Sequence, residues 1–461
     1  MKRLFGTDGI RGLAGEYPLD EPTVTRVGRA LADSLRAASG VAPRVVIGRD
    51  TRESGPAIEA ALARGVCDGG GRVDHGGVLT TPGVACVTRL EGYDAGLVVS
   101  ASHNPYRDNG IKVFSRTGEK LSDEMELAVE RMVLDGREET RGSPGAAAPA
   151  AAASGPQSLQ SADLAARYLA WLQGAVDPGA SLSGWRIVLD CANGAASELG
   201  PELYRRLGAT VTAVNARPDG RNINEDCGAL HPQGLAQEVL RQKARLGLAF
   251  DGDADRCLFV DSAGRALDGD YVLCLAARDL KAAGRLRGNA VVGTVMSNLW
   301  LEKALQQEGI CLSRAPVGDK YVLEEMLRGG YVLGGEQSGH IIFLEKATTG
   351  DGLLTGLLFL DLLRRTGLDL AAWAADIRPC PQVLVNVQVR ERPPLEKHPR
   401  IGPAIRDEER RLGRSGRLLV RYSGTEPKAR IMVEGESLQV VEEAAARLKW
   451  IIQREIGRDP S

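Results

Sequence analysis

Three aspartates stand at alternate positions in the segment DGDADRC, directly after the apolar run LGLAF: Asp251, Asp253 and Asp255. This spacing lets three carboxylates converge on one hard cation, and oxygen ligands suit Mg²⁺, which often completes its coordination with a substrate phosphate. A calcium-binding EF-hand loop opens similarly, but it needs glycine at its sixth place and an acid at its twelfth, where this chain has Arg256 and Ser262. Because a phosphatase with an aspartate nucleophile also places D-x-D after a strand, the segment indicates a metal site but leaves the reaction open.

Two serines in the segment SASHNPYRDNG, Ser100 and Ser102, are candidate nucleophiles. A serine hydroxyl is a weak nucleophile unless a base, a metal or a cation activates it. His103 adjoins the second serine, and Lys112 lies ten residues after it. The Asn-Pro and Asn-Gly pairs are equally typical of a polar turn without a catalytic role, so the segment alone leaves both interpretations open.

The segment GGEQSGH lies between two hydrophobic runs and places Glu336, Ser338 and His340 at alternate positions. Its glycines allow a ligand to approach the backbone closely. A carboxylate, a hydroxyl and an imidazole together suit a polyhydroxyl ligand such as a sugar, although a glycine-rich turn between strands has a similar sequence.

A fourth segment, RYSGTEPKAR, combines a turn with two flanking arginines, Arg421 and Arg430. The hydroxyl and N–H groups of such a turn can cradle an anion, and guanidinium groups match phosphate oxygens in pairs. The alternative is a hairpin with exposed arginines. The turn residues that would bind phosphate are Ser423, Gly424 and Thr425.

Short apolar runs alternate with helical patterns over most of the chain, which indicates βαβ units and largely parallel, covered sheets. All four polar segments follow apolar runs, at the strand ends where open α/β sheets bind ligands. The strands predicted in this way include 44–47, 187–190, 211–214 and 290–295, and the helices include 56–67, 199–207 and 297–307.

The C-terminal part has a different pattern, because strands at 418–422 and 429–433 flank a turn and Ser437 opens a long helix. It therefore predicts a smaller α+β domain. The segment 142–158 consists mainly of small residues and prolines and is interpreted as a linker. Helical pattern resumes at Ser161.

The composition narrows the class of protein. The 461 residues include 58 Lys and Arg against 60 Asp and Glu, and this balance argues against a nucleic-acid partner. No run approaches the roughly 18 apolar residues of a membrane span, and the polar start MKRLFGTDGIRG is unlike a secretory signal. The eight cysteines form no C-x-x-C pair and are expected to be small buried hydrophobes rather than disulfide or zinc ligands. We expect a cytoplasmic protein with no membrane partner.

The motifs SASHNP, DGDADR, GEQSGH and SGTEP, in this order, resemble the α-D-phosphohexomutase superfamily over nearly the whole chain. Within the superfamily, the chain is most similar to the phosphoglucosamine mutase branch in the segments FGTDGIRG, TVMSNLWLEKAL and TGDGLL. Gln337 also fits that branch, since phosphomannomutase/phosphoglucomutase relatives usually have methionine at the position of Gln337. The resemblance implies three similar mixed α/β domains with covered sheets and a smaller C-terminal α+β domain, arranged around a central active-site cleft. We expect these domains at 1–141, 159–252, 253–370 and 371–461.

The resemblance also implies a role for each motif. Ser102 would carry the phosphoryl group and, with the three aspartates, would hold one Mg²⁺. Arg256 and Lys112 would lie beside the transferring group, and one of them or His340 would move the proton. The residues expected to contact the sugar phosphate are Arg11, His103, Glu336, Ser338, His340, Arg421, Ser423, Gly424, Thr425 and Arg430.

The implied activity interconverts glucosamine 6-phosphate and glucosamine 1-phosphate through a phosphoserine enzyme and glucosamine 1,6-bisphosphate, and supplies UDP-N-acetylglucosamine and cell-wall synthesis. Glucose or glucosamine 1,6-bisphosphate would be the activator. Because C1 and C6 of a hexose lie too far apart for one transfer, the phosphoserine would phosphorylate one end and recover the other phosphate after the sugar turns round.

Three other functions stay open at this point: a phosphomannomutase/phosphoglucomutase, a Mg²⁺-dependent sugar phosphatase with Asp251 as nucleophile, and a non-catalytic module that binds sugar phosphates. The expected partner is a small sugar phosphate. The chain is expected to be a monomer or a homodimer.

Overall fold

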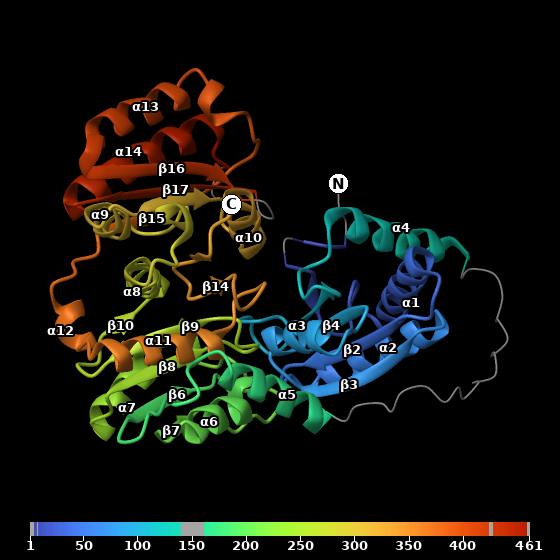
Figure 1. The fold of residues 1–461 in the computed structure, drawn as a ribbon. Coiled ribbons are helices and arrows are strands. Elements are labelled where there is room, and N and C mark those ends of the chain that lie inside the picture. Colours follow the sequence, from blue (N-terminus) through green and yellow to red (C-terminus); the bar gives the residue numbers. More distant parts are fainter. Residues whose placement is uncertain (1–3, 7, 140–160, 424–426, 459–461) are drawn as a thin grey trace.

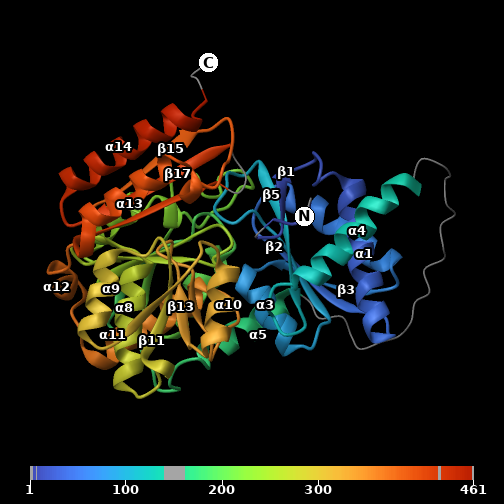
Figure 2. The same cartoon turned by 90° about the horizontal axis from the view of Figure 1, so that it is seen from above.

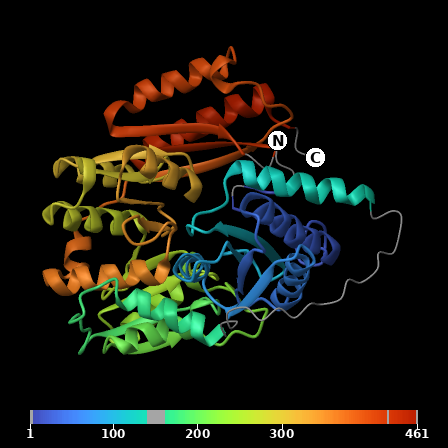
Figure 3. The ribbon, with the colours of Figure 1, turned by 45° about the vertical axis from the view of Figure 1, so that its right-hand side comes forward.

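Four β-sheets organise the described part of the chain, and each is built from a separate region of the sequence (Figure 1). The computed structural model describes residues 4–6, 8–139, 161–423 and 427–458. The linker predicted at 142–158 lies outside the described residues. We call the regions around the four sheets units 1 to 4. Units 2, 3 and 4 follow one another along one side of the molecule with unit 1 beside them (Figures 1 and 3), and the view from above shows the same separation (Figure 2).

Unit 1 has a mixed sheet in the order β1-β5-β4-β2-β3, in which β2 is parallel to β3 and β4 while β5 is antiparallel to β4 and β1. Alternate residues of β2 face opposite layers: Val45 and Ile47 pack with α1, α2 and α4, and Val46 packs with α3 and α5. The elements are β1 (Ile10–Leu13), α1 (Glu21–Ser39), β2 (Arg44–Arg49), α2 (Gly55–Asp68), β3 (Arg72–Val78), α3 (Thr81–Leu90), β4 (Ala95–Val99), β5 (Asp108–Ser115) and α4 (Asp123–Glu139).

Unit 2 repeats this plan with the strand order β10-β9-β8-β6-β7, where β6 is parallel to β7 and β8, and β9 is antiparallel to its neighbours. Since β9 and β10 extend this sheet past the boundary expected after residue 252, we propose that unit 2 continues to about Leu267. The elements are α5 (Ser161–Gln173), β6 (Arg186–Asp190), α6 (Ala196–Arg206), β7 (Thr210–Val214), α7 (Gln233–Gln242), β8 (Leu246–Phe250), β9 (Cys257–Asp261) and β10 (Ala266–Leu267).

Unit 3 has the order β12-β11-β13-β14, with β11 parallel to β12 and β13, and β14 antiparallel to β13. Its helix α11 also contacts α5, α6 and β9 of unit 2. The elements are α8 (Gly269–Ala282), β11 (Ala290–Thr294), α9 (Leu299–Gln307), β12 (Cys311–Ala315), α10 (Asp319–Gly329), β13 (Leu333–Gly335), β14 (Ile341–Phe343), α11 (Gly352–Thr366) and α12 (Leu370–Ala375).

Unit 4 is an antiparallel sheet in the order β15-β17-β16, covered on one face by α13 and α14. Its core forms because alternate residues such as Ala429, Ile431 and Val433 face Val441 and Leu448 of α14. The elements are β15 (Gln382–Gln388), α13 (Ile401–Leu412), β16 (Gly416–Tyr422), β17 (Lys428–Gly435) and α14 (Leu438–Ile456).

The predicted fold class of three mixed α/β domains and a C-terminal α+β domain is therefore confirmed. The sheets differ from the largely parallel expectation in one respect: each motif connects two antiparallel strands, namely β4 to β5, β8 to β9, β13 to β14 and β16 to β17. All eight cysteines are free thiols, and five of them are buried as expected; the expectation was wrong for Cys67 and Cys311, which are exposed, and for Cys380, which is partly exposed. Among the described helices, none has the length and apolar character needed to cross a membrane.

A buried hydrogen bond ties α5 to unit 3 and makes a testable contribution to stability. The Tyr168 hydroxyl lies 2.9 Å from both carboxylate oxygens of Asp351, which caps α11, and burial raises the pKa of Asp351 to about 6. Tyr168→Phe removes the bond but keeps the ring, so we expect the free energy of unfolding to fall by about 1–3 kcal/mol. Urea unfolding checks this, and an unchanged midpoint would show that the bond is not needed.

Candidate active site

The SASHNP loop between β4 and β5 presents Ser102 to unit 2. Its hydroxyl donates a 2.7 Å hydrogen bond to Oδ2 of Asp251, and its backbone has the left-handed φ of 53°. Such a conformation is uncommon for a residue with a side chain, so neighbouring groups must hold it. His103 Nδ1 lies 3.3 Å from the same hydroxyl. Burial, together with the positive charges of Arg256 and Arg11, lowers the pKa of His103 to about 4.

Ser100 has a different environment and supports the loop. Its hydroxyl donates to Asp50 at 2.6 Å and accepts the backbone N–H of Ser102 at 2.9 Å. The fully buried Arg52 pairs with Asp50 and donates to the carbonyls of Ser102 and Asn104. Because its hydroxyl is already committed to Asp50, Ser100 is placed to hold the loop, and Ser102 is the serine that faces the carboxylates.

The three aspartates of the β8–β9 loop form one buried cluster. Asp251 and Asp253 are each 1% exposed, Asp255 is 5% exposed, and one oxygen from each lies within 4.8 Å of the others. Burial and repulsion by the other two carboxylates raise the pKa of Asp251 well above its usual value. Such a cluster requires compensating positive charge, and its oxygens suit a hard metal ion.

Part of that charge comes from Lys112 on β5. Its ammonium lies 2.9 Å from Asp253, 3.2 Å from Asp255 and 3.3 Å from Asp8. Burial alone would lower the pKa of Lys112, but these carboxylates outweigh burial and raise the pKa well above its usual value. Thr81, in the first turn of α3, adds a 2.6 Å hydrogen bond to Asp253. Units 1 and 2 are thus joined through the cluster.

Asp8 forms ion pairs with several basic side chains next to the three-aspartate cluster. It was not among the site residues predicted from the sequence. It pairs with Arg11 of β1, with Lys112 and with Lys120. Lys120 also pairs with Asp319 of unit 3 at 2.6 Å. The only sequence signal for Asp8 is an acid within the glycine-rich FGTDGIRG segment; for Lys120 there is none.

The GEQSGH loop brings unit 3 to the same place. His340 Nδ1 lies 3.7 Å from Asp255, and its Nε2 accepts the backbone N–H of Gly350 at 2.9 Å. Glu336 accepts the N–H of Gly318 at 3.0 Å and lies 3.4 Å from the Ser338 hydroxyl. The loop is joined to unit 2 by the 3.0 Å bond from Cys257 N to the Gly339 carbonyl.

Arg256 lies at the junction of these loops. Burial alone would lower the pKa of its guanidinium, but Asp251, Asp255 and Glu336 outweigh burial and raise it. Its Nε is buried without a hydrogen-bond partner in the described structure. A buried donor of this kind is costly unless a ligand oxygen satisfies it, which suits a group that binds phosphate.

The fourth motif follows β16, and the end of β16 with the start of β17 is turned toward unit 1 in Figure 1. Arg421 and Arg430 are directly opposite each other in the strand register, and Arg430 donates to the buried Ser423 hydroxyl at 3.4 Å. Burial and the Arg430 charge lower the pKa of Arg421. Two adjacent guanidinium groups favour an anionic ligand. Gly424 and Thr425 lie outside the described residues.

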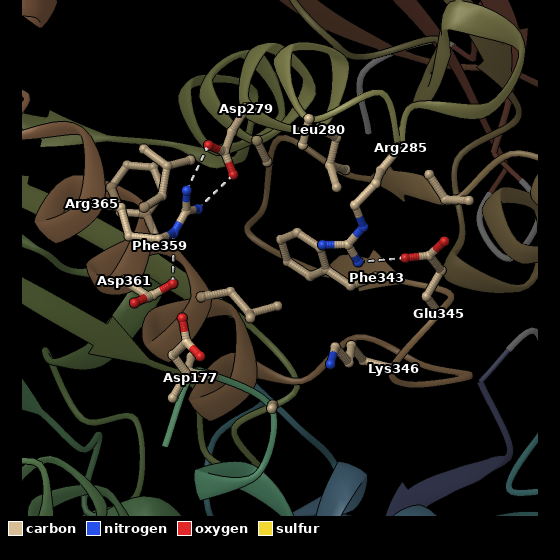
Figure 4. Close-up of a pocket in the computed structure, with 17 residues that line it drawn as sticks. Asp177, Asp279, Leu280, Arg285, Phe343, Glu345, Lys346, Phe359, Asp361 and Arg365 are labelled. Atoms are coloured by element: carbon tan, nitrogen blue, oxygen red, sulfur yellow. Dashed lines mark hydrogen bonds and ion pairs between the residues drawn. The ribbon is translucent and has the colours of Figure 1, made fainter. Parts of the chain in front are cut away.

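The structure therefore brings together the predicted residues of the first three loops. Gln337, on which the branch resemblance partly rests, donates its amide to Asp268 at 3.0 Å and so supports the cap of α8. A separate cavity of about 270 Å³ lies between α8, α11 and β14 (Figure 4). It contains none of the motif residues, and its Arg365 and Arg285 are paired with Asp279 and Glu345.

Family models of phosphoglucomutase/phosphomannomutase match nearly the whole chain. The α/β/α domains I, II and III match residues 2–140, 166–264 and 268–380, and the C-terminal domain matches 384–449. The chain belongs to this phosphoglucomutase/phosphomannomutase family.

The chain is similar over its full length to bacterial phosphoglucosamine mutases. It is 49% identical to that of Solibacter usitatus over 459 residues, covering 99% of both chains. It is also 49% identical to that of Koribacter versatilis over 461 residues, covering 99% of this chain and 98% of the relative.

Solved structures share the fold. A phosphoglucomutase/phosphomannomutase family protein of Burkholderia thailandensis has a TM-score of 0.78 at 24% identity, covering 99% of this chain and 100% of that one. N-acetylphosphoglucosamine mutase of Aspergillus fumigatus, solved with GlcNAc-6P and magnesium, has a TM-score of 0.65 at 20% identity and covers 98% and 96%.

The carboxylate cluster can be tested as a metal site without measuring activity. Asp253→Asn removes one charge from the three-carboxylate set, so we expect Mg²⁺ affinity in calorimetry to fall by roughly tenfold or more. Asp261→Asn is the matched control, because Asp261 is a buried acid of the same strand pair that instead accepts the N–H groups of Ala263 and Arg265. Equal Mg²⁺ binding by both variants would exclude this cluster.

Proposed function

We propose that this chain is a phosphohexomutase that interconverts glucosamine 6-phosphate and glucosamine 1-phosphate. The observation that carries the proposal is the Ser102 hydroxyl, bonded to Asp251 at 2.7 Å inside a cluster of three buried carboxylates. Relatives at 43–49% identity over their full length, all phosphoglucosamine mutases, support the choice of sugar.

Ser102 is the residue that carries the phosphoryl group in this proposal. The hydroxyl becomes phosphorylated, passes its phosphoryl group to one end of the sugar, and recovers the phosphate from the other end of the bisphosphate. Phosphoryl transfer requires chiefly positioning and charge stabilisation. The pairs Arg52–Asp50 and Ser100–Asp50 position the loop, while Lys112 and Arg256 supply positive charge beside it.

The cluster fits one Mg²⁺ per chain. Oδ1 of Asp253 and Oδ1 of Asp255 are buried without a hydrogen-bond partner in the described structure, and a hard cation would satisfy both. Asp251, Asp253, Asp255 and a phosphate on Ser102 would hold it. When bound, the ion would offset negative charge on the phosphoryl oxygens.

Unit 3 and unit 4 bind the rest of the substrate. Glu336 and Ser338 accept hydrogen bonds from the sugar hydroxyls. The residue that moves the proton is His340, which lies beside Asp255, or one of Lys112 and Arg256. The phosphate that is not reacting is held by Arg421, Ser423, Gly424, Thr425 and Arg430. Arg11 and His103 contribute from unit 1.

The proposal includes a 1,6-bisphosphate of glucose or glucosamine as activator, since an enzyme that has lost its phosphate needs a donor. The free thiols of the chain are typical of proteins in reducing compartments, and a cytoplasmic location is part of the proposal.

The proposed function predicts which serine carries the phosphoryl group and which sugar phosphate is the preferred substrate. Turnover of glucosamine 6-phosphate, started with a trace of glucose 1,6-bisphosphate, should fall at least about a thousandfold in Ser102→Ala. Ser100→Ala, the matched control in the same loop, should keep a measurable rate. Peptide mapping should find the phosphate on Ser102; phosphate on Ser100 would reverse the assignment. Equal or higher kcat/KM on glucose 1-phosphate or mannose 1-phosphate would instead indicate a phosphoglucomutase or phosphomannomutase.

The distal arginines should matter in both directions of the reaction. A hydrogen bond to a charged group contributes about 1.5–3 kcal/mol, so Arg430→Ala should lower kcat/KM roughly 10- to 150-fold from either sugar phosphate. Steady-state rates measured from the 1-phosphate and from the 6-phosphate check this. Because the equilibrium constant fixes the ratio of the two kcat/KM values, both must fall together, and unchanged values in Arg430→Ala would instead favour the interpretation of a hairpin with exposed arginines.

A further inference from the structure

The segment TVMSNL, residues 294–299, contains none of the residues proposed above to transfer phosphate or to bind the sugar. It forms a turn between β11 and α9 that unit 3 holds firmly. The N–H of Asn298 donates to the buried Asp270 at 2.7 Å, and Arg314 donates to the carbonyls of Thr294 and Ser297 at 3.0 and 2.8 Å. The turn is therefore a fixed part of unit 3.

Unit 4 attaches to this turn through an ion pair whose carboxylate is buried. Arg417 of β16 lies 2.7 Å from Glu434 of β17, which is fully buried. Arg417 also donates to the carbonyls of Val295 and Ser297 at 2.8 and 2.9 Å. Glu434 accepts the N–H of Leu299 at 2.8 Å. Both members of the pair thus bind the backbone of the turn.

A second contact lies where the chain enters unit 4. The Asn298 side chain donates to the carbonyl of Cys380 and accepts its N–H, both at 3.0 Å. Unit 4 has its own hydrophobic core, drawn from residues 383–456, and these contacts with the turn are polar. Hydrogen bonds can fix the orientation of unit 4 relative to unit 3 without a hydrophobic core shared by the two units. These contacts therefore suit a joint between units 3 and 4.

The joint and the phosphate loop occupy the same two strands. Arg417 faces Glu434, and Arg421 faces Arg430; the second pair lies four residues later in β16 and four residues earlier in β17. Since residues four apart in a strand share a face, both pairs lie on the sheet face opposite α13 and α14, about 13 Å apart. One end of this ribbon is anchored to unit 3, and the other end carries the phosphate-binding arginines.

We propose that Arg417 and Glu434 are positioning residues, which set the place of the distal phosphate site by anchoring the β16–β17 ribbon to the 294–299 turn. The inference rests on the proposed function for the identity of the ligand. Arg417 and Glu434 do not touch the sugar phosphate; they act through Arg421 and Arg430. Loosening the anchor weakens the hold on the phosphate that is not reacting, and the bisphosphate then leaves before the second transfer.

The test uses Arg417→Lys, which keeps the charge but loses the planar fork, and Glu434→Gln. The matched control is Arg447→Ala, which removes a two-contact ion pair with Glu408 inside unit 4, away from the turn. Binding of glucose 1,6-bisphosphate is measured by calorimetry in the Ser102→Ala background. KM, kcat and free bisphosphate released per turnover are measured with Ser102 intact.

We expect both anchor variants to bind the bisphosphate about 2- to 30-fold more weakly, the range seen for coupled residues without ligand contact. KM should rise for both sugar phosphates, released bisphosphate should increase, and Arg447→Ala should match the unmodified chain. Unchanged binding and release in both anchor variants, or an equal loss in Arg447→Ala, would overturn the inference. The binding measurement does not depend on turnover, so absence of mutase activity in the unmodified chain would count against the proposed function alone.

Discussion

Mutual repulsion of three buried carboxylates is the constraint on which the site depends. Two unit charges 4 Å apart interact by about 4 kcal/mol at the effective dielectric of a protein, and the oxygens of Asp251, Asp253 and Asp255 lie within 4.8 Å of one another. The β8–β9 loop alone does not neutralise them. Lys112 supplies positive charge from unit 1, Arg256 adjoins the cluster, and the His340 imidazole of unit 3 lies 3.7 Å from Asp255. The charge of the β8–β9 loop therefore favours the packing of unit 1 against unit 2.

The repeated architecture explains how one chain delivers four such loops. In each unit the motif joins two antiparallel strands, and in the first three units these strands lie next to a parallel core. A short connection between paired strands is held at both ends, so it presents side chains in a fixed direction. Unit 4 uses the same connection in an all-antiparallel sheet, and it is attached to unit 3 through the polar contacts of Arg417 and Glu434.

Much of the fold was predictable from the sequence, because short apolar runs mark the strands and helix faces that become buried. The strands predicted at 44–47 and 187–190 lie within β2 and β6, and the helix expected after Ser437 is α14, for which Ser437 is the N-terminal flanking residue. The antiparallel return of β5, β9 and β14 was not predicted, since strand direction depends on partners that the local pattern does not contain. For the same reason the sheet of unit 2 extends past the boundary expected after residue 252.

The motifs also indicated which residues approach one another, but not what holds them. Arg52 pairs with Asp50, and Asp8 pairs with Arg11, but the serines and lysines that they also contact lie far away in sequence. Lys112, for example, contacts Asp253 across 141 positions. Gln337 is a different case: the resemblance singled it out, and the structure shows that its amide bonds Asp268 at the cap of α8.

The central claim is that the phosphate of the product passes through Ser102, and a single-turnover labelling experiment tests it most directly. The protein is phosphorylated with ³²P from labelled glucose 1,6-bisphosphate, freed of excess donor, and mixed with unlabelled glucosamine 6-phosphate. The account predicts that the label leaves the protein and appears in glucosamine 1,6-bisphosphate and glucosamine 1-phosphate. Label released as inorganic phosphate, or label that stays on the protein while product forms, would contradict it.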